Sequence, residues 1–184
     1  MSAAALGPAP DLIEPVVGFR SWRTLDGYIS SPYVPVRWRD PVMHATCRPG
    51  VISRGEWLTE PHRAPHPDCR CGIYAYHSPQ CRFAAIDFRN IPGIVTLWGR
   101  IEVHRGGMRA EHARIHALAF FRGWGGRQCR AARQVADNLG VDLVDWAEIG
   151  AAAREYGRSL PRAMMPQEPP VIAPAPWWSR WLAG

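Results

Sequence analysis

The feature that most constrains the fold is a stretch of sixteen residues, HRAPHPDCRCGIYAYH, from His62 to His77. It contains three histidines and two cysteines, and its two prolines and one glycine restrict or redirect the backbone. Imidazole nitrogen and cysteine sulfur are the ligands with which zinc builds tetrahedral sites. The stretch therefore predicts a zinc ion that holds a long connection in a defined shape.

The zinc ligands are expected to include the C-x-C pair. Gly72 follows this pair and lets the backbone turn tightly enough for both sulfurs to face one point. The predicted set contains four residues, Cys47, His62, Cys69 and Cys71. His66 competes with His62, and Cys81 or His77 could replace one member. The alternative interpretation is that the cysteines are small core side chains and the histidines are solvated.

A zinc ion with four protein ligands has no open position for a reacting water, so the predicted role of the ion is structural. The N-terminal residues lack the basic and apolar regions of an export signal, and no apolar run approaches the roughly 20 residues of a membrane span. We therefore expect a cytoplasmic protein with reduced cysteines. Reduced cysteines favour metal binding over disulfides.

The hydrophobic pattern predicts an α+β protein with a small twisted antiparallel sheet or partial β-barrel, a zinc-clamped loop, and two C-terminal helices before a Pro/Trp tail. Alternation with a period of two indicates strands over 15–24, 28–38, 43–47, 83–89, 93–104 and 108–118. Residues 71–78 fit one helical turn or a short strand, and residues 48–68 read as a loop. The helices are expected over 128–139 and 145–160.

The chain is predicted to contain one domain over residues 13–160. Residues 1–12 read as a disordered lead-in, and residues 161–184 as a Pro-rich linker with a Trp-rich end. Residues 135–149 also have the packing positions of a helix-turn-helix. Three acidic residues would face the DNA groove in that arrangement, so an ordinary αα-hairpin is the favoured interpretation.

The excess positive charge is concentrated in one segment. Eight arginines and two glutamates lie between Arg100 and Arg133, so this segment carries the whole net charge of +6. Arginine neutralises phosphates and tryptophan stacks on bases, which predicts a non-catalytic nucleic-acid-binding face. Its residues would be Arg100, Arg105, Arg109, Arg122, Trp124, Arg127, Arg130 and Arg133. The alternative is a flexible connection with solvated arginines.

Two further functions fit parts of the sequence. Trp177, Trp178 and Trp181 in the tail could anchor a protein partner, or could dock on the parent domain. A small enzyme could use His104 as a base, Arg109 as an anion clamp and Glu111 as a carboxylate. The chain has no lysine, which excludes a Schiff-base lysine and a phosphate-loop lysine. It also has no nucleophile elbow and no H-E-x-x-H sequence.

Three motifs, GFRSW, C-x-C-G-I-Y-A and LWGRIEVHRGGMRAEHA, resemble those of a family of small proteins from high-GC bacteria and their phages. The resemblance covers about residues 15–118. It implies no activity, and no catalytic residue is carried over from it.

Overall fold

The computed structural model describes residues 14–25, 27–32, 34, 36–47, 52–53, 56–57, 62–79 and 90–166. The expected lead-in, the strand predicted over 83–89 and the tryptophans of the tail lie outside the described residues, and so does Cys81. Within the described part the protein is a sheet-rich α+β structure with a twisted sheet and two α-helices. The predicted α+β class is confirmed at this level.

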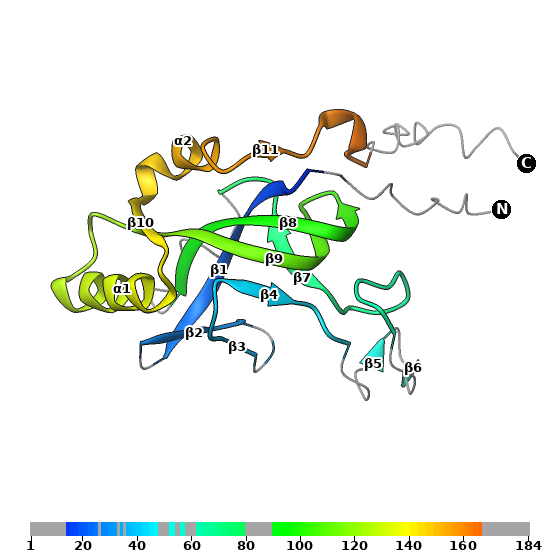
Figure 1. The fold of residues 1–184 in the computed structure, drawn as a ribbon, viewed down its shortest axis with the longest axis horizontal. Coiled ribbons are helices and arrows are strands. Elements are labelled where there is room, and N and C mark those ends of the chain that lie inside the picture. Colours follow the sequence, from blue (N-terminus) through cyan, green and yellow to red (C-terminus); the bar gives the residue numbers. More distant parts are fainter. Residues whose placement is uncertain are drawn as a thin grey trace, which may run out of the picture.

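A long hairpin forms the centre of the sheet (Figure 1). Strand β8 (Asn90–His104) turns at Arg105 and Gly106 into β9 (Gly107–Phe120), so that His104 lies opposite Gly107. Seven consecutive residues of β8, from 91 to 97, are buried, because the sheet is covered there on both faces. The predicted hairpin and its turn are therefore confirmed.

The second edge of β9 is shared by three short strands that follow one another along it. Strand β7 (Ile73–Tyr76) pairs with its start, β4 (Val42–His44) pairs antiparallel with its middle, and β10 (Asp142–Asp145) pairs parallel with its end. Of the two interpretations for residues 71–78, the short strand is confirmed. The parallel pairing of β10 shows that the sheet is mixed and not purely antiparallel.

Strand β1 (Val16–Leu25) lies along the other edge of β8 and also touches β7, where Phe19 is opposite Tyr76. Strands β1, β8, β9 and β7 therefore pair in a closed ring. Four more short strands lie in the N-terminal half: β2 (Tyr28–Ser30), β3 (Arg37–Trp38), β5 (Ile52–Ser53) and β6 (Glu56–Trp57). The last two form a separate pair inside the segment that the sequence indicated as a loop.

Helix α1 (Gly126–Leu139) covers one face of the sheet. It buries Ala132, Val135, Ala136 and Leu139 in the larger core cluster, which also contains Trp22 and Trp38 packed edge to face with ring centroids 5.5 Å apart. Gly140 ends the helix in the left-handed conformation with φ 63°. The helix predicted over 128–139 is confirmed, with two more residues at its start.

The second predicted helix is wrong over most of its length. Residues 142–145 form β10, a 3-10 turn η1 (Trp146–Glu148) follows, and α2 (Ile149–Ala153) has five residues. A second helix is thus present but short: it ends before Gly157, which has φ 148°, and Arg158–Ser159 pair with β1 instead of continuing the helix. The αα-hairpin and the helix-turn-helix are therefore both wrong.

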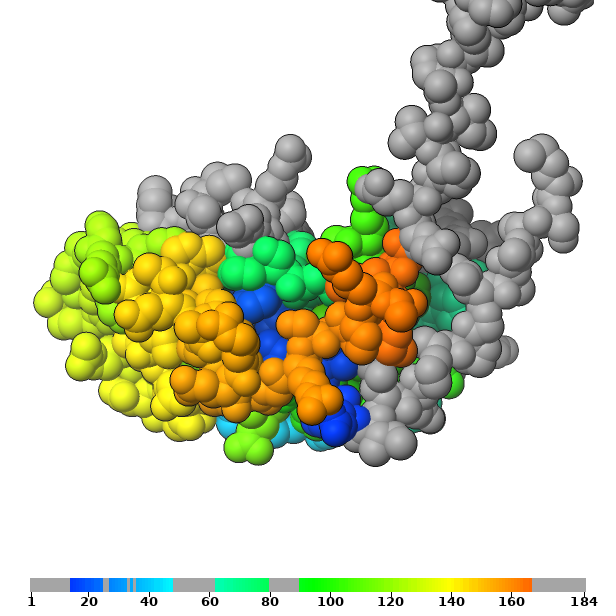
Figure 2. All heavy atoms as spheres, turned by 90° about the horizontal axis from the view of Figure 1, so that it is seen from above, coloured from blue at the N-terminus to red at the C-terminus, as the bar shows by residue number. Residues whose placement is uncertain are grey.

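The C-terminal elements cover the opposite face of the sheet. Ile149 and Ala153 of α2 pack with Val17, Phe19 and Ile94 in a second core cluster. After α2 the chain continues through β11 (Arg158–Ser159), parallel to the start of β1, and η2 (Arg162–Met164). Figure 2 shows these segments lying over β1. None of the helices in the described part has the length and apolar character that a membrane crossing requires.

Candidate metal centre and the adjoining pocket

Strand pairing brings the four predicted metal ligands together. Cys47 lies just after β4, and Cys69 and Cys71 lie just before β7; both strands pair with the same edge of β9. His62 joins them from the connection between these strands. The ligand atoms of Cys47, His62, Cys69 and Cys71 all lie within 4.8 Å of one another, so this cluster could hold a metal ion.

The spacing within the cluster matches a tetrahedral ion. The sulfurs of Cys47 and Cys69 are 3.9 Å apart, and the sulfur of Cys71 is 3.4 Å from Nε2 of His62. Zinc bonds of about 2.3 Å to sulfur and about 2.0 Å to nitrogen place tetrahedral ligands about 3.8 Å and about 3.5 Å apart. All four cysteines in the described ranges are free thiols. The cluster therefore has metal-site spacing and not disulfide spacing.

The pKa values of two thiols in the cluster are raised by their protein surroundings. Burial, followed by the neighbouring thiol of Cys69, raises the pKa of Cys71 to about 12. The same two causes raise the pKa of Cys47. The thiols of Cys47 and Cys71 therefore resist ionisation by themselves, whereas a bound divalent cation deprotonates its thiol ligands.

The alternative histidine ligands have other contacts. The ring of His66 lies beside that of His62, with centroids 4.5 Å apart, and its Nδ1 accepts from the backbone N–H of Asp68 at 3.3 Å. His77 lies after β7, where its Nε2 donates to the carbonyl of His104 at 2.9 Å. Neither belongs to the four residues whose ligand atoms converge.

The segment 62–71, which carries His62, Cys69 and Cys71, is called the metal-binding loop, and Arg109 of β9 supports it. The side chain of Arg109 is buried, and its guanidinium donates to the carbonyl of Cys69, to the carbonyl of Cys71 at 3.1 Å and to that of His66 at 3.4 Å. The same guanidinium forms an ion pair with Glu102, the residue opposite it on β8. The assignment of Arg109 to an exposed nucleic-acid-binding face is therefore wrong: its charge is used inside the protein.

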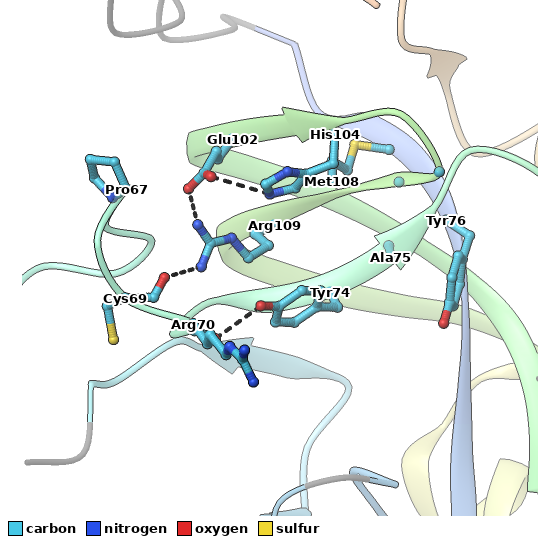
Figure 3. Close-up of a pocket in the computed structure, with 12 residues that line it drawn as sticks. Pro67, Cys69, Arg70, Tyr74, Ala75, Tyr76, Glu102, His104, Met108 and Arg109 are labelled. Carbon is cyan, nitrogen blue, oxygen red and sulfur yellow. Dashed lines mark hydrogen bonds and ion pairs between the residues drawn. The ribbon is translucent and has the colours of Figure 1, made fainter. Parts of the chain in front are cut away.

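A pocket of about 460 Å³ lies between this loop and the turn of the β8–β9 hairpin (Figure 3). Its polar wall contains Arg109, Glu102 and His104. Nε2 of His104 is 3.2 Å from a carboxylate oxygen of Glu102. Tyr74 and Tyr76 line it from β7. The pocket thus shares Cys69 and Arg109 with the metal-binding loop.

Glu111 is not part of this pocket, so the predicted catalytic trio does not assemble. Its carboxylate accepts from Arg63 at 2.7 and 2.6 Å and from the backbone N–H of Arg100 at 3.2 Å. The hydrogen bond from Arg63 is the main reason why the pKa of Glu111 falls to about 2. Glu102 takes the place that the sequence interpretation gave to Glu111.

The arginines predicted to form one face lie at two ends of the molecule. Arg100 and Arg105 lie near the hairpin turn, while Arg122, Arg127, Arg130 and Arg133 follow β9 or lie on α1. Arg105 lies just before the start of β9 and Arg100 lies beside Glu111 near its middle, whereas the second group follows its end at Phe120. Arg122 pairs with Asp145, and Trp124 packs against Phe121 with ring centroids 5.4 Å apart.

Glu102, Tyr74 and Tyr76 line the pocket but are not among the residues that the sequence pattern predicts for a site. The two-residue turn supplies the signal that could have found Glu102, because it fixes the register in which Glu102 lies opposite Arg109. The tyrosines depend on the pairing of β7 with β9, which no local pattern indicates.

Comparison with known proteins gives no match: no family model fits the chain, and no curated protein or solved structure is significantly similar to it.

Proposed function

We propose that this is a zinc-stabilised, non-catalytic nucleic-acid-binding protein. The observation that supports zinc is the ligand set itself, three sulfurs and one imidazole nitrogen within 4.8 Å of one another, with a sulfur pair and a sulfur–nitrogen pair at tetrahedral spacing. Thiolate-rich tetrahedral sites select zinc among the common divalent ions. Four protein ligands fill its coordination sphere, which gives the ion a structural role.

The proposed nucleic-acid contact is the arginine row of α1, which consists of Arg127, Arg130 and Arg133. These residues are three positions apart and exposed, so they lie side by side along the helix, while its other side is buried in the core. Repeated cations on a rigid helix suit the regularly spaced phosphates of a nucleic acid. The proposal thus moves the contact from the whole segment 100–133 to one helix.

We expect the full chain to bind a short DNA duplex with an affinity that falls steeply with salt. Three phosphate contacts give a logarithmic slope of about −2.7, so raising the salt concentration from 50 to 200 mM weakens binding about 40-fold. Changing all three residues of the arginine row to glutamine should remove this slope. Fluorescence anisotropy of a labelled duplex across a salt series measures it.

A matched control variant replaces three exposed arginines of the C-terminal elements, Arg154, Arg158 and Arg162, by glutamine. It changes the net charge by the same amount and should keep most of the binding. Equal losses in both variants would show that net charge alone attracts the duplex, and this result would reject the arginine row.

The adaptor function through Trp177, Trp178 and Trp181 stays a prediction. Those residues lie outside the described part of the chain.

A further inference from the structure

The floor of the pocket beside the metal-binding loop is built from two rows of residues that cross three strands. The first row contains Glu102, Arg109 and Tyr74. The second row contains His104, Gly107 and Tyr76. A Cβ on Gly107 would lie 2.3 Å from the carbonyl oxygen of Ala75, so the centre of the second row is restricted to glycine. The result is a hollow between ring-bearing side chains.

The tyrosine spacing fits a flat ring. Tyr74 and Tyr76 are two residues apart on β7, so both side chains leave the same face of the strand. Their Cα atoms are about 6.8 Å apart in an extended strand. Stacked bases are about 3.4 Å apart, so one base between two rings needs about 6.8 Å. Tyr74 is 44% exposed; its hydroxyl donates to the carbonyl of Arg70 at 3.1 Å and the Arg109 guanidinium lies 5.7 Å from its ring centroid, which fixes the ring and leaves part of it accessible.

The carboxylate of Glu102, in the polar wall of the pocket, can accept further hydrogen bonds. Arg109 and His104 already contact the carboxylate of Glu102, but a carboxylate has about four acceptor positions. Those that remain can accept from the exocyclic amino group of a base, as acidic side chains do with cytosine. Arg70 lines the pocket and Arg105 lies in the adjoining hairpin turn; both are exposed, and their charge suits the flanking phosphates.

We propose that this pocket binds one unpaired base, carrying an exocyclic amino group, from a single-stranded nucleic acid. The inference rests on the proposed nucleic-acid-binding function and adds the form of nucleic acid that is recognised. The base stacks on the tyrosine pair of β7, and its amino edge reaches Glu102. A base within a duplex has its faces covered by its neighbours, so the pocket selects against duplex.

The test compares labelled eight-nucleotide strands of oligo(dC) and oligo(dT) with a duplex of the same length, using anisotropy at low salt and the full chain. We expect oligo(dC) to bind more tightly than oligo(dT). Tyr74→Leu should weaken oligo(dC) binding by about 5- to 150-fold, the range for one stacked base. The same variant should leave duplex binding unchanged.

Tyr28→Leu is the matched control, because Tyr28 is also 44% exposed but lies on β2. If Tyr74→Leu behaves like Tyr28→Leu, or if oligo(dT) binds as well as oligo(dC), the base pocket is rejected. The proposal for the arginine row is unaffected by that result, because the salt dependence of duplex binding tests it separately. If cytidine monophosphate binds as tightly as oligo(dC), the pocket recognises a mononucleotide, and the proposal of a single-stranded nucleic acid is overturned. Binding of no nucleic acid by the unaltered protein would overturn both proposals.

Discussion

Removal of zinc should lower the melting temperature of this protein by roughly 8–16 °C. At free zinc about 1,000-fold above its Kd, binding to the folded state contributes about 4 kcal/mol. For a chain of this size each kcal/mol corresponds to about 2–4 °C. The core clusters on both faces of the sheet do not involve the ion, so we expect a lower melting point and not complete unfolding. Thermal unfolding with and without a zinc chelator measures the difference.

The zinc content of the protein should depend on the cysteines of the cluster and not on Cys129. We expect about one zinc per chain by mass spectrometry of the purified protein, and a loss of that zinc in Cys71→Ser. Cys129→Ser is the matched control, because Cys129 is a free thiol on α1 whose sulfur donates to the carbonyl of Trp124 at 3.7 Å. Full zinc content in Cys71→Ser, or no effect of the chelator on melting, would contradict the structural zinc site.

Arg109→Met should be the most damaging arginine substitution in the described part of the sheet. Methionine keeps the apolar part of the side chain but leaves Glu102 without its ion pair and three loop carbonyls without their donor. The pair is only part-buried, since Glu102 is 30% exposed and still contacts His104, so the cost comes mainly from the loop carbonyls that lose their donor, about 1–3 kcal/mol. Loss of a group that orients the ligands weakens metal binding by about 10- to 100-fold. Chemical unfolding and competition with a chromogenic chelator measure the two effects.

Arg114→Met provides the comparison, since Arg114 is exposed on the same strand. It should change stability by less than about 0.5 kcal/mol, as surface substitutions usually do. An Arg109→Met protein with the stability and zinc affinity of Arg114→Met would show that the guanidinium does not support the loop. A larger loss in unfolding than in zinc affinity would still agree with its position between the loop and β8.

The sequence was sufficient for the features that depend on local pattern. The hairpin of β8 and β9, the helix α1 with its glycine cap, and the four residues of the metal cluster all follow from alternation, capping and ligand chemistry. The cluster was predictable because cysteine and histidine carry their chemistry in any fold. A tetrahedral ion also needs four of them together.

Features that depend on distant pairing were not predictable from local pattern. Asp145, predicted to start a helix, does cap a turn, accepting from the backbone N–H of Ala147 at 2.9 Å, but no local pattern indicated a strand over residues 142–145. They form a strand because the end of β9 offers an unpaired edge. Arg109 similarly resembles any other arginine of its segment. Arg109 differs from the exposed arginines only because the strand register places its guanidinium against the carbonyls of Cys69 and Cys71.

The sharing of one edge of β9 by three short strands links the metal cluster to the solubility of the protein. Two of these strands, β4 and β7, adjoin the ligands Cys47, Cys69 and Cys71, so one ion fastens both of them to the edge. Release of that ion would loosen both strands together and uncover backbone donors and acceptors from the start to the middle of β9. An uncovered strand of that length is a template on which a second molecule can add its own strand. An ion bound at this cluster would therefore guard against self-association as well as shape a loop.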